Sequence, residues 1–181
     1  MSTFKIYLIE DEQKHVEETI NKLRAAASER ENGNTFEFEW MKGTVKTGRE
    51  EYIFYEKIIL EEIRKCIDRD KKKGFFIGLL LDTLLTQEDI ERTITSYYAR
   101  ASIARDIFFQ FYEEIPVYII TASSVFGSQS DIIMGKDLSG QYINQRRLTM
   151  NPLKNVREDT ERLFLFYEEF YESTRKKKGV K

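Results

Sequence analysis

The sequence predicts an α/β protein in which helices flank a doubly wound, five-stranded parallel sheet. Short apolar runs alternate along the chain with longer segments that carry apolar residues at helical spacing. One run, Phe75 to Leu81, is apolar at almost every position, as expected for a strand buried on both faces. Acidic or hydroxyl side chains directly follow three of the runs. Strands that alternate with helices indicate parallel crossovers, which give the doubly wound class.

Length and composition are those of one soluble domain over residues 1–181. The chain is 41% apolar and 33% charged, with a formal net charge of -2, so it lacks the basic signature of a nucleic-acid-binding protein. No apolar stretch of the sequence approaches the roughly 20 residues of a membrane-spanning helix. The single Cys66 cannot form an internal disulfide, and the N-terminus has no signal pattern. We therefore expect a cytoplasmic protein that binds neither nucleic acid nor membranes.

The first third of the chain is predicted to form two strands and one helix. Residues 4–9 form the first strand, and residues 14–29 form a helix with apolar side chains at helical spacing. The breaker Asn32-Gly33-Asn34 ends this helix. Residues 35–41 alternate between aromatic and acidic side chains, which predicts a strand with one wetter face near an edge of the sheet.

The rest of the chain is predicted to form two long helices, three strands and a closing helix. The long amphipathic helices are placed at residues 49–71 and 88–113. The strand at 75–81 lies between them in sequence and belongs in the sheet centre. The chain then continues with a strand at 117–121, a short strand at 147–150 and a helix from about Leu153 to Arg175.

Polar side chains stand where three predicted strands end. Glu10 and Asp11 follow the first strand, Asp82 follows the central strand, and Thr121 ends the strand at 117–121. The carboxyl ends of neighbouring parallel strands meet in one crevice, where ligands usually bind. Three carboxylates there would form an oxygen-rich pocket suited to a hard cation such as Mg²⁺, beside a hydroxyl that can bind an anion. The sequence therefore predicts a phosphoryl-accepting aspartate site.

Four segments, in the same order, resemble the receiver domain of bacterial two-component response regulators. The resemblance covers essentially the whole chain. The segments are similar to the family's acidic cluster after the first strand, its phosphoacceptor strand, its Thr-Ala strand ending and its Lys-Pro corner, and they lie at residues 6–12, 79–85, 115–122 and 149–153.

The resemblance implies a role for each matching position. Glu10, Asp11, Asp82 and the backbone carbonyl of Leu84 would hold Mg²⁺. Asp82 would accept a phosphoryl group from a histidine kinase or phosphotransfer protein, and Thr121 would bind the new phosphate. Output would pass through contacts with a downstream protein. The chain would be no enzyme beyond its own phosphoryl transfer and autodephosphorylation.

The chain departs from the family pattern at two positions. Asn151 stands where the family has a lysine that binds the phosphate, and an amide carries no charge for that purpose. Leu148 stands at the aromatic switch position and has no hydroxyl. The family pattern also favours a cis Asn151-Pro152 bond. These departures keep open a pseudo-receiver whose signalling depends on protein contacts and not on phosphate.

Other classes fit the acids less well. A haloacid-dehalogenase-like phosphatase needs a second carboxylate two positions after its nucleophile, and Leu84 occupies that place after Asp82. A topoisomerase-primase-like metal site lacks its Asp-x-Asp pair for the same reason. An interaction module with incidental acids is a further alternative. The apolar run Leu163 to Tyr167 is either core or a contact surface for a partner or a homodimer.

Overall fold

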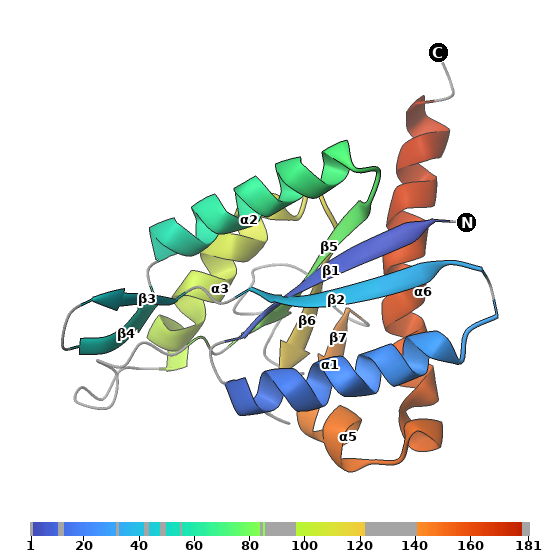
Figure 1. The fold of residues 1–181 in the computed structure, drawn as a ribbon, viewed down its shortest axis with the longest axis horizontal. Coiled ribbons are helices and arrows are strands. Elements are labelled where there is room, and N and C mark those ends of the chain that lie inside the picture. Colours follow the sequence, from blue (N-terminus) through green and yellow to red (C-terminus); the bar gives the residue numbers. More distant parts are fainter. Residues whose placement is uncertain are drawn as a thin grey trace.

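Figure 1 shows the fold as a ribbon in a computed structural model. The structure describes residues 2–10, 13–31, 33–41, 44–47, 50–54, 56–83, 85, 97–121 and 141–178. None of the helices within these ranges is long and apolar enough to cross a membrane.

The centre of the protein is a five-stranded sheet in which every pair of neighbouring strands is parallel. Its order is β2-β1-β5-β6-β7, which is 2-1-3-4-5 when the five strands are counted along the chain. This order and the flanking helices give a flavodoxin-like α/β fold, so the predicted fold class is confirmed. The strands are β1 (Thr3–Ile9), β2 (Thr35–Met41), β5 (Phe76–Asp82), β6 (Val117–Thr121) and β7 (Tyr142–Asn144).

Helices cover both faces of the sheet and create two cores. On one face α2 (Glu56–Lys72) and α3 (Tyr97–Phe111) pack against alternate strand residues such as Ile9 and Leu79. On the other face α1 (Gln13–Ser28), α5 (Gln145–Met150) and α6 (Leu153–Lys178) pack against the intervening residues, such as Leu8 and Leu80. Because β5 is buried on both faces, its apolar run is continuous, as the sequence predicts for a central strand.

The predicted helix at 49–71 is wrong at its beginning. Residues Glu50–Phe54 form β4, which pairs with β3 (Thr44–Thr47) in a separate antiparallel ribbon, and α2 begins only at Glu56. Tyr52, Ile53 and Phe54 are β-branched or aromatic, and such residues favour strands. Of the second long helix, predicted at 88–113, α3 accounts for 97–111, while residues 88–96 lie outside the described part of the chain.

The predicted strand at 147–150 is also wrong, because these residues belong to α5. The side chain of Asn144 accepts a hydrogen bond from the backbone N–H of Arg147 at 2.9 Å and caps this helix. Leu148 is buried on its inner side. The last strand is instead β7, which ends at Asn144. The Asn151-Pro152 bond is trans, since the described residues contain no cis peptide bond, so the cis bond expected there is wrong.

Candidate acidic site at the carboxyl edge of the sheet

The structure brings together the carboxyl ends of β1, β5 and β6. Glu10 follows β1 directly, Asp82 ends β5 and Thr121 ends β6, and all three side chains are buried. β1 pairs with β5 so that Ile9 lies opposite Leu81, which sets Glu10 beside Asp82 one residue further along. β5 pairs with β6 up to Asp82 opposite Ile120, the residue before Thr121.

This edge is the topological switch point of the sheet. From β1 the chain passes through α1, on one face, to β2, whereas from β5 it passes through α3, on the opposite face, to β6 (Figure 1). In open α/β sheets, ligands bind outside the carboxyl ends of the two strands between which the crossovers diverge. Glu10 and Asp82 stand at those two ends.

Neutral groups from three elements hold Glu10. Gln145, the first residue of α5, donates a hydrogen bond from its Nε2 to the carboxylate Oε2 of Glu10 at 3.1 Å. The same nitrogen lies 3.2 Å from the hydroxyl of Thr19 on α1. Trp40 on β2 donates from its indole Nε1 to the backbone carbonyl of Glu10 at 2.8 Å. The acid is therefore fixed at the rim, because α1, α5 and β2 all contact it or its partner.

Sequence reasoning missed Gln145. It lies immediately after the last strand, at the same edge of the sheet as the acids, and it is buried. The signal was its position at the strand end. That position was hidden because the strand was placed at 147–150 instead of 142–144.

Thr83 directly follows Asp82, the last residue of β5. Its side chain is fully buried, and its Oγ1 has no hydrogen-bond partner among the residues that the structure describes. A buried hydroxyl without a partner costs free energy.

The predicted Mg²⁺ ligands fall into two groups. Glu10 and Asp82 are placed as described above, whereas Asp11 and Leu84 lie outside the described residues. Within the described ranges, no group of three His, Cys, Asp or Glu side chains is arranged to hold a metal ion. The two carboxylates are hard oxygen donors of the kind that Mg²⁺ prefers. The full magnesium site stays a prediction.

Asn151 lies at the C-terminal end of α5 and not at a strand end. Its side-chain Nδ2 donates to the backbone carbonyl of Arg147 at 2.8 Å, within its own helix. Its own carbonyl accepts a hydrogen bond from Lys22 of α1 at 3.0 Å. These contacts give Asn151 a role in joining α5 to α1.

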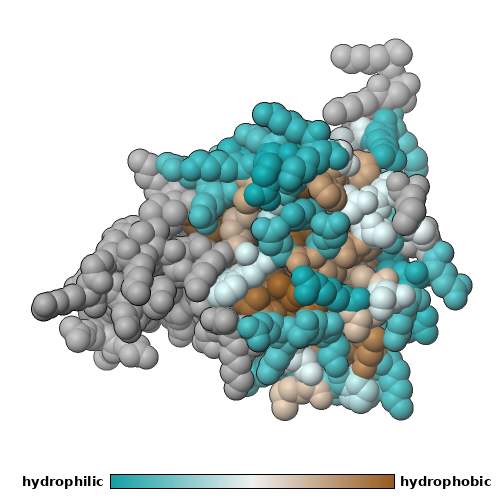
Figure 2. Space-filling view, in the orientation of Figure 1, coloured by the Kyte–Doolittle hydropathy of each residue, from teal (hydrophilic) through white to brown (hydrophobic). Residues whose placement is uncertain are grey.

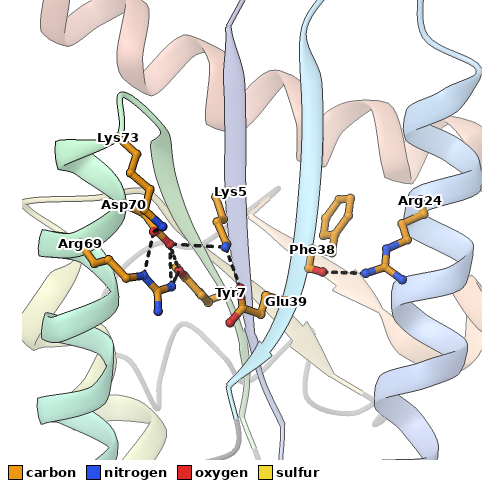
Figure 3. Close-up of polar contacts among 8 residues, drawn as sticks. All are labelled: Lys5, Tyr7, Arg24, Phe38, Glu39, Arg69, Asp70 and Lys73. Atoms are coloured by element: carbon orange, nitrogen blue, oxygen red, sulfur yellow. Dashed lines mark hydrogen bonds and ion pairs between the residues drawn. The ribbon is translucent and has the colours of Figure 1, made fainter.

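A second polar cluster, around Asp70, lies on the α2 face of the sheet and was not foreseen from the sequence (Figure 3). The Asp70 carboxylate is fully buried and accepts hydrogen bonds from the Tyr7 hydroxyl and, at 2.8 Å for each oxygen, from Arg69. Lys5 lies 3.4 Å and Lys73 3.2 Å from its oxygens. Lys5 also pairs with Glu39 on β2 at 2.7 Å. The cluster therefore joins the C-terminal end of α2 to β1 and β2.

The charges of this cluster are fixed at neutral pH. Hydrogen bonds from Arg69, reinforced by Tyr7 and Lys73 against the effect of burial, hold the pKa of Asp70 well below its usual range. Burial raises the pKa of Tyr7 well above its usual range, and its hydrogen bond to Asp70 raises it further. Burial acts to lower the pKa of Lys5, but contacts with Glu39 and Asp70 outweigh it and the pKa is raised. Groups that keep one protonation state suit a structural clamp better than acid–base catalysis.

The polar residues Lys5 and Tyr7 within an otherwise apolar strand were the only signal for this cluster in the sequence. Their partner Asp70 is far away in sequence, and helix periodicity alone did not mark it. Comparison of the chain with protein-family models, curated proteins and solved structures gave no match.

Proposed function

We propose that this chain is a receiver-like signalling domain of the cytoplasm that accepts a phosphoryl group on Asp82. The observation that supports the proposal is the burial of Glu10 and Asp82 at adjacent strand ends, with Thr121 on the next strand. Carboxylate oxygens are the ligands that hard cations such as Mg²⁺ prefer, and a hydroxyl can donate a hydrogen bond to an anion. Two carboxylates at the switch point of the sheet fit a site that takes a cation and an anion together.

The chemistry proposed for Asp82 is a direct displacement. One carboxylate oxygen attacks the phosphorus of a phosphohistidine on a partner kinase or phosphotransfer protein. The new O–P bond forms as the P–N bond breaks, and the leaving imidazole nitrogen keeps the electron pair and is reprotonated from water. Little covalent chemistry is required of the protein, so the strand ends need only position the carboxylate.

The other residues of the edge bind and orient. Glu10 and Asp82, with Asp11 and the Leu84 carbonyl, are the proposed ligands of Mg²⁺, which when bound neutralises charge on the carboxylates and the incoming phosphoryl oxygens. Thr121 is proposed to donate its hydroxyl to a phosphoryl oxygen. The neighbouring surface would then change its contacts with a downstream protein.

A phosphorylation-independent pseudo-receiver is the second candidate, and the contact between Gln145 and Glu10 favours it. An amide donates a hydrogen bond to the carboxylate but brings no positive charge to the edge. A phosphoaspartate would therefore gain less there than it would from a lysine. In this alternative the sheet edge keeps its fold and acts through protein contacts alone.

Intact-mass spectrometry with acetyl phosphate and Mg²⁺ distinguishes the two. The proposal predicts a gain of one phosphoryl group that requires Mg²⁺ and is absent in Asp82→Asn. Asp106→Asn, a change on α3 away from this edge, is the matched control and should still be phosphorylated. Magnesium binding without any mass gain would leave the pseudo-receiver as the better account. A mass gain that persists in Asp82→Asn would contradict the assignment of the acceptor.

A further inference from the structure

β2 is a seven-residue strand at one edge of the sheet. It pairs with β1 on one side, and its other side is the outer edge of the sheet. Alternate residues of a strand direct their backbone groups to opposite sides. Thr35 donates its N–H to Ser2, toward β1, whereas the carbonyl of Phe38 accepts a hydrogen bond from Arg24 at 3.0 Å, on the other side. Phe36 and Phe38 therefore direct their N–H and C=O groups away from the sheet. Such an edge is a template for another strand.

A groove follows this edge. Its volume is about 740 Å³, and it is lined by residues 35–39 of β2, by Lys5 of β1, by the second half of α1 and by residues between α1 and β2. Two of its three cations are already paired, Lys5 with Glu39 and Asp70, and Arg30 with Glu161 and Glu168. Figure 3 views the sheet from the β2 edge, with α2 on one side and α1 on the other, and shows Arg24 reaching across to Phe38. On the face shown in Figure 2, hydrophobic side chains lie in the centre between hydrophilic ones over α1 and α2. A chain in extended conformation would run between these two helices.

The two rows of β2 side chains differ in chemistry. Glu37 and Glu39 are exposed on the α2 side, and Phe36 and Phe38 lie on the α1 side. Glu39 pairs with Lys5, while Glu37 has no ion-pair partner among the described residues. A strand beside β2 would place its side chains opposite this acidic row on one face. Lysine or arginine at alternate positions would complement that row.

The same charges disfavour a second copy of this chain as the occupant. In an antiparallel pair of β2 strands centred on Phe38, Glu37 of each copy would face Glu39 of the other. Like charges directly opposite each other on neighbouring strands are destabilising. These charges therefore disfavour pairing of β2 with a second copy of itself and favour pairing with a strand that carries basic side chains.

We propose that β2 binds an extended segment of a partner protein that carries lysine or arginine at alternate positions, by addition of a strand to the sheet edge. Backbone hydrogen bonds to Phe36 and Phe38 supply pairing, and the acidic row supplies selectivity. Arg24 is a removable cap: its side chain is exposed, and it leaves the Phe38 carbonyl when the segment pairs. The proposal does not depend on Asp82, and Asp82→Asn is expected to bind the segment equally well.

Peptides test the backbone pairing directly. The probe is a short peptide that alternates lysine and valine, labelled for fluorescence anisotropy, with a glutamate–valine peptide as its control. The lysine peptide is expected to bind and the glutamate peptide not to bind, with affinity falling as salt is added. The residues of a strand that pair with one neighbour all share one side-chain face. Two methylated peptides are compared, one with every lysine amide N-methylated and one with every valine amide N-methylated. Only one of the two rows of amides faces β2, so one methylated peptide should lose binding and the other should keep it. Equal effects of the two methylated sets would overturn strand addition.

Variants of the protein test the surface. Glu37→Lys is expected to bind the lysine peptide about tenfold more weakly, whereas Glu172→Lys, the same charge change on exposed α6, should bind as the wild type does. Arg24→Ala should bind it more tightly, because the Phe38 carbonyl is uncapped and a cation is removed. Equal losses in Glu37→Lys and Glu172→Lys would show attraction by net charge alone and contradict the proposal. Self-association of the wild type that Glu37→Lys changes would assign this edge to a second copy instead.

Discussion

The hydroxyl of Tyr171 on α6 accepts a hydrogen bond from the backbone N–H of Ile77 at 2.9 Å and donates one to the carbonyl of the same residue at 2.6 Å. β6 begins to pair with β5 only at Leu79, opposite Val117. Tyr171 therefore satisfies both backbone groups of a central strand at a point where the neighbouring strand has not yet begun. The Tyr171 hydroxyl makes the two hydrogen bonds to Ile77 that a neighbouring strand would otherwise make.

We predict that Tyr171→Phe destabilises the protein by about 1 to 3 kcal/mol, because the buried amide and carbonyl of Ile77 lose their partner. Burial already raises the pKa of Tyr171 to about 12, so the hydroxyl keeps its proton at neutral pH. Urea unfolding followed by circular dichroism measures the difference. Tyr112→Phe, which removes a hydroxyl bound to exposed Glu113, is the control and should change stability by less than about 0.5 kcal/mol. Equal effects of the two variants would contradict this reading.

Gly78→Ala is predicted to cost about 1 to 3 kcal/mol through overpacking. A Cβ at this position would lie 2.4 Å from Cε1 of Tyr167 and 2.9 Å from Cδ1 of Ile6. The Tyr167 ring cannot retreat easily, because it is fully buried and its hydroxyl donates to the carbonyl of Leu79 at 2.6 Å. In a double-mutant cycle with Tyr167→Leu, the cost of Gly78→Ala should shrink. Additive costs would show that the ring is not the obstacle.

Asp70 is predicted to make the stability depend on pH in the acid range. Its pKa is depressed in the folded protein relative to an unfolded value of about 4, so its contribution is complete above about pH 5 and is lost as the pH falls below about 4. One such group changes the free energy of unfolding by up to about 1.4 kcal/mol per pH unit. Asp70→Asn should be less stable at pH 7 and show a shallower loss between pH 5 and pH 2. Exposed Glu172→Gln should keep the wild-type slope, and an unchanged slope in Asp70→Asn would contradict the clamp.

Gln145→Ala is predicted to weaken Mg²⁺ binding by about tenfold, because residues that orient metal ligands have effects of that size. The amide of Gln145 fixes the carboxylate of Glu10 at 3.1 Å, and its removal leaves that side chain less ordered. Arg146→Ala, the next residue of α5 but exposed, should bind Mg²⁺ as the wild type does. Isothermal titration with MgCl₂ measures both variants. Unchanged binding in Gln145→Ala would remove Gln145 from the proposed site.

The sequence was sufficient for four of the five strands of the sheet, because its signals there are local and strong. The continuous apolar run of β5 marked the sheet centre, and the alternation of β2 marked an edge, and both are confirmed. Since parallel strands end at one edge, the meeting of Glu10, Asp82 and Thr121 followed from their positions at strand ends. Both the register and the burial of these three agree with that expectation.

The sequence was insufficient where an element is short or where contacts join distant residues. β7 has only three residues, and its end is marked by the Asn144 cap of α5, which periodicity does not detect. The error displaced the last strand and hid Gln145. The Asp70 cluster forms only where α2 packs against β1. Tyr7 and Asp70 are 63 residues apart in sequence, so no local sequence pattern predicts their contact.

The central claim, that Glu10 and Asp82 form one magnesium-binding edge with Thr121 and Gln145, is tested most directly by an NMR titration with MgCl₂. We predict saturable shifts of backbone amides confined to the carboxyl ends of β1, β5 and β6 and the start of α5, and we expect these shifts to be lost in Asp82→Asn. Shifts centred elsewhere, or no saturable shifts at all, would contradict it.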